Sequence, residues 1–355
     1  SPSTRPQGRT ALGSGGMGRE PLESLESLEP FEPWQWNPED FARACEALRA
    51  RPEVAAHVAR SRYPLHMVRY WLSARLMAPC LRGRAAPRVM EIGVDRGQFF
   101  HVCRSLPEWI EGTRWHGADV NAAAQALTQQ GYEAMHLADF TDARAVQALV
   151  DHPAHRGRYD AVVALHFLEH LPDPEACLRW IRPLLKPDGV LVGGMPSCPE
   201  FARAARERHL RRHAAPFGHQ SVFSVERVAQ ALNAIGLAHQ RITGAFFARS
   251  RDSWLEDSAR WLRFNLWFGQ RFPRWPGEVY FAASARRVPR FAMIASWTSS
   301  GTMSSVTAGG CAALAAAIFA SRAATDCNAF ISTSFTDASS PASASAFLTT
   351  SSTAP

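Results

Sequence analysis

Residues 159–196 read YDAVVALHFLEHLPDPEACLRWIRPLLKPDGVLVGGMP, and this stretch decides the fold class. It begins with an apolar run at 159–165, which predicts a fully buried strand. An amphipathic helix is expected at 176–185, and the Lys-Pro-Asp-Gly sequence after it indicates a turn. A second apolar run at 190–194 predicts another buried strand. Two buried strands joined through a helix predict a parallel βαβ unit.

The alternation of strands and helices continues on both sides of this unit. Further strands are expected at 88–92, 115–120, 134–138, 239–243 and 278–283, and a further helix at 225–235 with Gly236 as its C-terminal stop. Such alternation implies a mainly parallel sheet that is covered on both faces. The sequence therefore predicts a Rossmann-like α/β fold, with a mainly parallel seven-stranded sheet and helices on both faces.

The two ends of the chain differ from this central part. The N-terminal residues are rich in Pro, Gly and Ser and hold too few apolar side chains to offset the entropy of ordering. Asn37-Pro38-Glu39-Asp40 then has the composition of a helix start, and helical patterns follow it. We expect four segments: a disordered one at 1–36, a helical extension or lid at 37–85, the α/β domain at 86–288, and a low-complexity, disordered tail at 289–355.

Composition narrows the class of protein only slightly. Hydrophobic residues make up 46% of the chain, enough for a sizeable core, and the net charge of +7 comes almost entirely from arginine. The seven cysteines are odd in number and include no C-x-x-C pair, which argues against a disulfide framework or a zinc site. No signal-peptide pattern occurs, and the longest apolar run is too short to span a membrane. These features favour a cytoplasmic protein with reduced thiols and no bound metal.

A glycine-containing turn follows the expected strand at 88–92. The sequence VMEIGVDRG places Glu91 near the end of that strand and Gly93 and Gly97 in the turn. Glycines there let the backbone approach a nucleotide-like ligand, and the next helix points its N-terminus at the same site. A plain structural turn is the alternative. The G-x-G-x-x-G fingerprint of hydride-transferring dehydrogenases is absent from this turn, which weighs against that class.

Acidic residues stand at the ends of the next two expected strands. Asp119 stands at the end of the strand expected at 115–120. A carboxylate there can accept hydrogen bonds from both ribose hydroxyls of an adenosine, although a helix N-cap is the alternative role. Asp139 can accept a hydrogen bond from the adenine amino group while Phe140 packs on the ring. Their order along successive strands favours one shared nucleotide site.

The LHFLEHLPDP run, followed by a helix, K-P-x-G and an apolar strand, resembles the class I S-adenosylmethionine (SAM)-dependent methyltransferases. The similarity is to their small-molecule branch, which is related to ubiquinone and menaquinone C- and O-methyltransferases. It continues in the H-x-x-x-F-S segment at 219–224 and covers about residues 86–287. The resemblance implies SAM as cofactor and these contacts: Glu91, Gly93 and Gly97 for the cofactor, Asp119 for the ribose, Asp139 and Phe140 for the adenine, and Leu165 and His166 beside the methyl group.

This sequence departs from the family's pattern in two places. Asp95 stands where the family has its middle glycine, which puts a carboxylate near the amino-acid end of the cofactor. The interval from Glu91 to Asp119 is also longer than usual, so the assignment of Asp119 is less secure than that of Gly93. Decay into a non-catalytic cofactor-binding or interaction module is the alternative that Asp95 raises.

Methyl transfer from a sulfonium needs mainly the alignment of acceptor, carbon and sulfur, so a catalytic base is optional. His166 and His219 are the candidate catalytic bases, because imidazole titrates near neutral pH and both lie where the acceptor is expected. His170 is a weaker candidate. The alternative for each is a histidine that only packs or caps.

The methyl acceptor is expected to be a small molecule, with an O, N or C atom as the site of methylation. Residues 254–275 are rich in Trp and Phe, which suggests an apolar acceptor or contact with a membrane surface, or else aromatics buried against the sheet. The arginine-rich segment at 201–213 can bind an acidic group, but a solvated helix face is the simpler interpretation. Nucleic acid is disfavoured as acceptor, because the sequence shows no N-P-P-[YF]-type tetrapeptide. The oligomeric state does not follow from the sequence.

Overall fold

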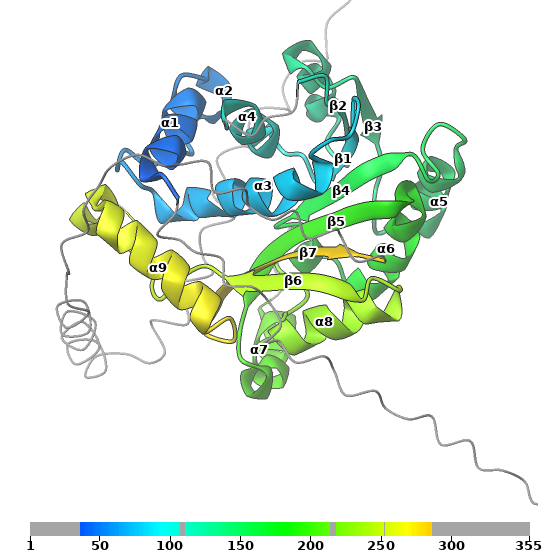
Figure 1. The fold of residues 1–355 in the computed structure, drawn as a ribbon. Helices are drawn as coiled ribbons and strands as arrows, with labels where there is room; N and C mark the ends of the chain where they lie inside the picture. Colours follow the sequence, from blue (N-terminus) through cyan, green and yellow to red (C-terminus); the bar gives the residue numbers. More distant parts are fainter. Residues whose placement is uncertain (1–35, 107–110, 214–217, 252, 286–355) are drawn as a thin grey trace, which may run out of the picture. The chain divides into compact units, whose positions relative to one another are not determined.

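The computed structural model describes residues 36–106, 111–213, 218–251 and 253–285. Within them, seven strands form one sheet in the order β3-β2-β1-β4-β5-β7-β6 (Figure 1). The strands are β1 (Arg88–Ile92), β2 (Arg114–Asp119), β3 (Ala134–Leu137), β4 (Tyr159–Leu165), β5 (Leu185–Ser197), β6 (His239–Gly244) and β7 (Gly277–Ser284). Strands β1 to β5 run parallel, and β7 runs antiparallel to both β5 and β6. The predicted Rossmann-like fold with a mainly parallel seven-stranded sheet is confirmed.

Helices cover both faces of the sheet, also as predicted (Figure 1). One face is covered by α1 (Pro38–Arg49), α3 (Val68–Leu81), α4 (Gln98–Ser105) and α9 (Ala259–Arg271). The other is covered by α5 (Ala143–Asp151), α6 (Pro174–Ile181) and α8 (Val225–Ala234). The remaining helices are α2 (Pro52–Ala55), α7 (Glu200–Arg212) and the short 3₁₀ segments η3 (Leu65–Met67), η4 (Ala122–Gln130), η5 (Leu168–His170), η6 (Arg182–Leu184) and η7 (Trp254–Asp257).

The strand alternation assigns side chains to these two layers. In β1, Val89 packs with the first layer, whereas Met90 and Ile92 pack with the second. All seven residues of β4 are buried, as expected for the central strand of a parallel sheet with both faces covered. The apolar run that predicts this strand is therefore explained by its position in the middle of the sheet.

The N-terminal helices complete the first layer. Helix α1 begins where predicted, with the Asn37 side chain accepting a hydrogen bond from the Glu39 N–H at 3.1 Å. Phe41 of α1 packs on Trp71 of α3 with ring centroids 5.2 Å apart. Helix α3 in turn packs against α4, β5 and β7, so the predicted helical extension forms part of the core. The N-terminal segment before residue 36 and the tail after residue 285 lie outside the described residues.

The turn predicted from the Lys-Pro-Asp-Gly sequence at 186–189 is wrong, because β5 already begins at Leu185. Leu185 pairs with Tyr159, and the register then shifts before Ala161 pairs with Val190, so the intervening residues form an irregularity within the strand. Lys186 Nζ holds this segment by pairing with both carboxylate oxygens of Asp160 at 2.8 Å.

The aromatic and arginine-rich segments are partly exposed. Helix α7 has no buried residue, in agreement with a solvated helix face. Helix α9 buries Trp261 but leaves Trp267 39% exposed. Trp254, in the 3₁₀ segment η7 before this helix, is 75% exposed. None of the described helices is both long enough and apolar enough to cross a membrane.

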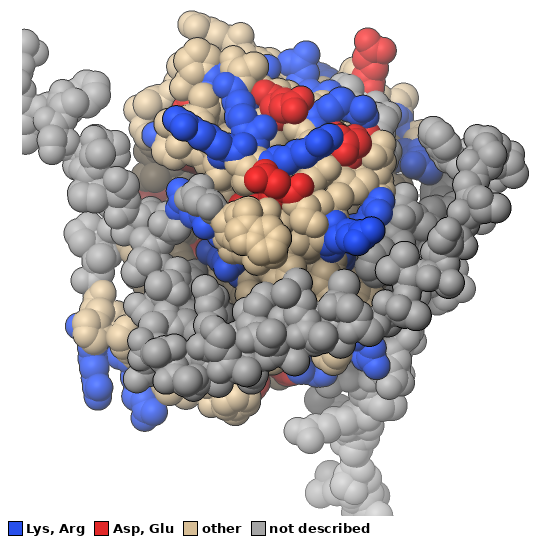
Figure 2. Space-filling view, turned by 90° about the vertical axis from the view of Figure 1, so that its left-hand side faces the viewer, with Lys and Arg blue, Asp and Glu red and all other residues tan. Residues whose placement is uncertain are grey.

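Arginine side chains on the face that carries α1 and α9 lie next to acidic ones (Figure 2). Arg43 pairs with Asp40 inside α1, and Arg62 Nη2 lies 2.7 Å from Glu39 Oε2. The positive charges on this part of the surface are therefore locally compensated.

Candidate functional site

The turn after β1 has a backbone that glycine accommodates best. Gly93 has φ +71° and Gly97 has φ +75°, both in the left-handed region. A Cβ atom on Gly93 would lie 2.7 Å from Phe167 Cδ2, so this position has neither the backbone freedom nor the space for a side chain. Gly97 is the residue before α4, so the turn leads directly to the N-terminus of that helix.

Asp95 also has a left-handed backbone, with φ +52°. This explains why glycine is favoured at this position, and why aspartate is one of the few residues that can replace it. Its carboxylate points largely into solvent, with 69% of the side chain exposed, and Oδ2 accepts a hydrogen bond from Gln98 Nε2 at 3.0 Å. The substitution thus keeps the turn and adds a carboxylate at its surface.

Asp119 lies directly beside this turn. Its Oδ2 accepts a hydrogen bond from the Asp95 N–H at 3.0 Å, and its Oδ1 accepts one from the Asn121 N–H at 2.8 Å. The N-cap of the following 3₁₀ helix is Asn121, whose side chain accepts from the Ala123 N–H, so the alternative role of Asp119 as that cap is wrong. The longer interval between Glu91 and Asp119 does not separate Asp119 from the glycine turn.

Glu91 is buried below the turn, on the side of α4. Its Oε2 accepts a hydrogen bond from the Tyr132 hydroxyl at 2.7 Å. Burial raises the pKa of Glu91 to about 8, with the nearby carboxylates of Asp119 and Asp95 acting in the same direction and the Tyr132 hydrogen bond opposing them. Glu91 is therefore protonated at neutral pH in this structure.

The end of β3 brings Asp139 and Phe140 to the same edge of the sheet. The Ala138 N–H donates to the Asp119 carbonyl oxygen at 3.0 Å, which places this segment next to Asp119. The exposed Asp139 carboxylate accepts hydrogen bonds from the N–H and the hydroxyl of Thr141. Phe140 is buried and packs edge-on against Phe167, with ring centroids 5.3 Å apart.

The end of β4 places Leu165 and His166 at the centre of this edge. Leu165 pairs with Gly194 of β5, and the His166 N–H donates to the Gly194 carbonyl oxygen at 2.7 Å. His166 has φ +48°, a strained conformation for a residue with a side chain. Strain of this kind is common where a side chain is held in position for binding or chemistry.

Buried acidic groups lie on both sides of the His166 ring. Nδ1 lies 3.2 Å from Glu169 Oε1, and Nε2 lies 3.6 Å from Glu278 Oε2. Burial lowers the pKa of His166 to about 4, with the guanidinium of Arg69 adding to this effect and Glu169 opposing it. The imidazole is therefore neutral at physiological pH and able to accept a proton.

His219 faces the same buried carboxylate from the other side. Its backbone is placed by the Gln220 N–H, which donates to the Glu169 carbonyl oxygen at 2.7 Å. The His219 and His170 rings meet edge-on at 4.9 Å, and one ligand atom of each lies within 4.8 Å of a Glu169 oxygen. Burial lowers the pKa of His219 to about 4. The structure thus gathers both predicted bases around Glu169.

Sequence reasoning missed a charged cluster beside His166. Glu278 at the start of β7 has a fully buried side chain and accepts hydrogen bonds from Arg69, Arg249 and Tyr280. The distance from Arg69 Nη2 to Glu278 Oε1 is 2.9 Å. The available signal was an acid at the start of an apolar strand, but its two arginine partners lie 29 and 209 positions away and no local pattern joins them.

The residues predicted to bind the cofactor therefore lie along one edge of the sheet, at the carboxyl ends of β1 to β4, whereas His219 follows α7. This edge is where ligands bind in open parallel α/β sheets, next to the point at which the strand order reverses. Hydrogen bonds connect Asp95 to Asp119 and Asp119 to Ala138, and Gly93 approaches Phe167.

Comparisons with known proteins show similarity to methyltransferases. The sequence model of a methyltransferase-domain family matches residues 63–241. The ubiquinone biosynthesis O-methyltransferase of Marinobacter nauticus is 32% identical over 106 residues, which are 30% of this chain and 42% of that relative. The matched part therefore spans less than half the length of the curated relative.

Solved structures of methyltransferases are also similar to the chain. A SAM-dependent methyltransferase from Archaeoglobus fulgidus is 19% identical, with a TM-score of 0.39 over 61% of this chain and 93% of that one. An O-methyltransferase family protein from Burkholderia thailandensis is 15% identical, with a TM-score of 0.39 over 62% of this chain and 56% of that one.

Proposed function

Because the chain belongs to the class I SAM-dependent methyltransferases, we propose that it transfers a methyl group from SAM to an O, N or C atom of a small-molecule acceptor. The curated relative is named as an O-methyltransferase of ubiquinone biosynthesis, which makes a hydroxyl on an apolar molecule the favoured acceptor. SAM supplies an activated methyl group on a sulfonium, so the protein's task is to bind, orient and exclude water.

The cofactor-binding residues are proposed to be those on the shared edge. Gly93 and Gly97 let the backbone approach the amino-acid end, below which Glu91 lies buried. The Asp119 carboxylate accepts two backbone N–H groups and, since a carboxylate has about four acceptor positions, retains capacity for the ribose hydroxyls. Asp139 and Phe140 then lie next along the edge, on the side of the adenine, and Leu165 and His166 on the side of the methyl group.

The acceptor is proposed to bind on the other side of His166. A neutral His166 with its proton on Nδ1, the nitrogen that lies 3.2 Å from Glu169 Oε1, has an unprotonated Nε2, which is a buried atom with no hydrogen-bond partner among the described residues. An acceptor hydroxyl within reach of Nε2 can transfer its proton there as the methyl group arrives. Glu169 orients the ring and stabilises the imidazolium that forms. His219 is the second candidate for this role.

The observation that carries the proposal is the hydrogen bond from the Asp95 N–H to Asp119, because it joins the glycine turn of β1 to the carboxylate of β2 in one binding edge. The test is calorimetric titration of the full chain with SAM and with S-adenosylhomocysteine. We expect Gly93→Arg to abolish binding and Asp119→Ala to weaken it about tenfold or more, because hydrogen bonds to a charged group contribute about 1.5–3 kcal/mol.

Gly83→Arg is the matched control, since Gly83 also has a left-handed backbone, φ +78°, but no atom lies within 4 Å of its Cβ position. Unchanged binding in the Gly93→Arg protein would refute the assigned site. A folded wild-type chain that binds neither compound would favour the interaction-module alternative.

The role of His166 is tested separately, with S-adenosylhomocysteine release measured on phenolic acceptors of increasing apolar length. Replacing His166 with Gln should lower kcat by about 10²–10⁴-fold while leaving the affinity for SAM nearly unchanged. Glu169→Gln should shift the pH profile of kcat, because it removes the carboxylate that orients the ring. Loss of SAM affinity in the His166→Gln protein would instead show that this residue serves to bind the cofactor and is not the base.

A further inference from the structure

Three histidines meet on the face of the sheet that α5 covers, away from the glycine turn of the proposed methyl-transfer site. His116 lies in β2, His136 in β3 and His155 in the turn between α5 and β4. All three belong to the layer that contains α5. They come from segments separated by up to 39 positions in the sequence, so the fold and no local motif brings them together.

The three imidazoles are close enough to share one ion. One ring nitrogen from each lies within 4.8 Å of the other two. The His136 and His155 rings meet edge-on with centroids 4.5 Å apart, and the His116 and His136 rings stack at 5.8 Å. Nitrogen atoms around a tetrahedral Zn²⁺ are about 3.3 Å apart when each Zn–N distance is about 2.0–2.1 Å. Adjustment of His155, which lies in a turn, can supply the remaining approach.

Hydrogen bonds to Tyr159 account for one nitrogen of two of these rings. The Tyr159 hydroxyl, which can donate one proton and accept another, lies 2.7 Å from His155 Nδ1 and 3.2 Å from His116 Nδ1. His136 Nε2 is buried and has no hydrogen-bond partner among the described residues. A buried ring nitrogen without a partner is costly unless a ligand occupies its lone pair or takes its proton.

The ligand set suits a divalent transition metal. Imidazole nitrogens are common ligands of Zn²⁺, Co²⁺ and Ni²⁺, and three of them converge here from separate elements of the fold.

The charges around His116 are one carboxylate and two guanidinium groups. Glu133 Oε2 lies 3.3 Å from His116 Nε2, so the carboxylate can fix the orientation of the ring. Such carboxylate–histidine contacts are common behind metal ligands. Arg88 Nη2 also lies 3.3 Å from His116 Nε2, and Arg114 pairs with Glu133, so both arginines oppose a cation.

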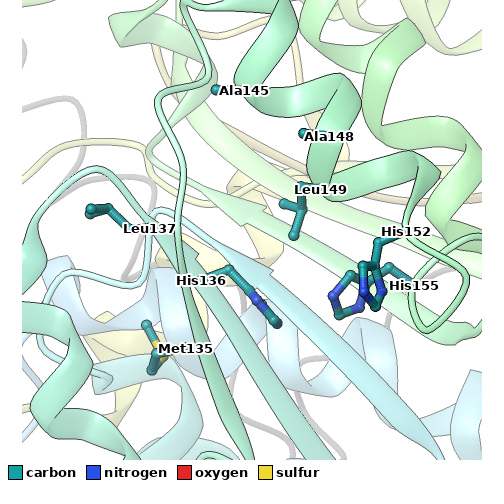
Figure 3. Close-up of a pocket in the computed structure, with 8 residues that line it drawn as sticks. All are labelled: Met135, His136, Leu137, Ala145, Ala148, Leu149, His152 and His155. Atoms are coloured by element: carbon teal, nitrogen blue, oxygen red, sulfur yellow. The ribbon is translucent and has the colours of Figure 1, made fainter.

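A solvent-accessible cavity leads to the cluster. It has a volume of about 460 Å³ and opens between β3 and α5. Figure 3 shows His136 reaching it from the strand, with His152 and His155 beyond the end of the helix. An ion can therefore enter from solvent, and water can complete its coordination.

We propose that His116, His136 and His155 bind a divalent transition-metal ion, with Zn²⁺ as the preferred probe and water from the cavity as a fourth ligand. The ion would tie β2, β3 and the α5–β4 turn together. The cysteine pattern did not predict a zinc site, because these ligands are histidines without regular spacing. Structural zinc sites stabilise the folded state by binding it in preference to the unfolded chain.

The test uses the full chain freed of metal and titrated with Co²⁺, whose visible absorption reports four-coordinate binding, followed by competition with Zn²⁺. We expect saturable binding and a rise in Tm with Zn²⁺. His136→Ala should abolish the Co²⁺ bands, and Glu133→Gln should weaken affinity about 10–100-fold. His155→Gln, in a turn, is the second ligand variant should His136→Ala fail to fold.

Two control variants test whether Co²⁺ binds at other groups of histidines instead. His219→Ala removes a member of the Glu169–His170–His219 group, and His209→Ala breaks the exposed stacked pair with His213. Both should keep the Co²⁺ bands. Absence of saturable binding, or bands that persist in the ligand variants and vanish in a control variant, would overturn the proposal. SAM affinity is measured in parallel, so that failure of this site and failure of the methyltransferase site are distinguishable.

Discussion

Replacing Gly93 by alanine tests whether close approach, as well as backbone conformation, requires glycine in the turn after β1. The left-handed φ of +71° costs an alanine about 1–2 kcal/mol. The new Cβ would also lie 2.7 Å from Phe167 Cδ2, and forcing a methyl group into a packed site costs about 1–3 kcal/mol. We therefore expect Gly93→Ala to lower the free energy of unfolding by about 2–5 kcal/mol.

Gly83→Ala separates the two contributions. Gly83 has φ +78° and open space around its Cβ position, so this variant should lose only the conformational part, about 1–2 kcal/mol. Urea denaturation followed by tryptophan fluorescence measures both variants. The reduced unfolded-state entropy of alanine affects them equally and cancels in the comparison. An equal loss in the two variants would refute the assigned contact with Phe167.

Three further predictions concern charge and backbone. Glu91 keeps its proton to about pH 8 in the folded chain but only to about pH 4.5 in the unfolded chain. The contribution of this carboxyl group to the free energy of unfolding is therefore fully present below pH 4.5 and is lost as the pH rises to 8. Glu91→Gln should flatten this decline by up to about 1.4 kcal/mol per pH unit, as measured by urea denaturation across that range. Glu278→Ala should destabilise the fold by about 3–5 kcal/mol because it removes the buried carboxylate that pairs with the half-buried Arg69, whereas Asp151→Ala, in an exposed pair with Arg156, should cost at most about 1 kcal/mol by the same assay. Asp95→Gly relieves a left-handed backbone but loses the bond to Gln98 and gains chain entropy when unfolded, so Tm should change by only a few degrees; a large drop would show that the carboxylate stabilises the turn.

The sheet and the cofactor edge could be predicted because their signals are local. Apolar runs separated by helical patterns identify the strands, and the chain direction of a βαβ unit places every strand end on the same edge. Glu91, Gly93, Gly97 and Asp119 each follow or end such a strand, so their common location follows from topology. The start of β5 was predicted wrongly. The Pro-Asp-Gly sequence indicates a turn, but the pairing of Leu185 with Tyr159 makes it part of the strand.

The acceptor side was harder to predict because its contacts are long-range. Arg69 comes from the N-terminal extension and Glu278 from the last strand, and only the folded chain places them beside His166. The same holds for the histidine cluster, where three strand and turn residues converge and two of them, His116 and His155, contact Tyr159. Pairings of this kind carry no sequence periodicity.

The reversed direction of β7 has a consequence for the order in which the site is built during synthesis. All the proposed cofactor residues have been synthesised once the chain reaches His166, but Glu278 follows more than 100 residues later. Because β7 runs against β5, its first residues come to lie level with the last ones of β5, as in the pairing of Glu278 with Pro196. Until that strand inserts between β5 and β6, Arg69 lacks its buried counter-charge. The nascent chain therefore holds every proposed cofactor residue before it holds the buried carboxylate beside His166, and premature termination between them would leave the first without the second.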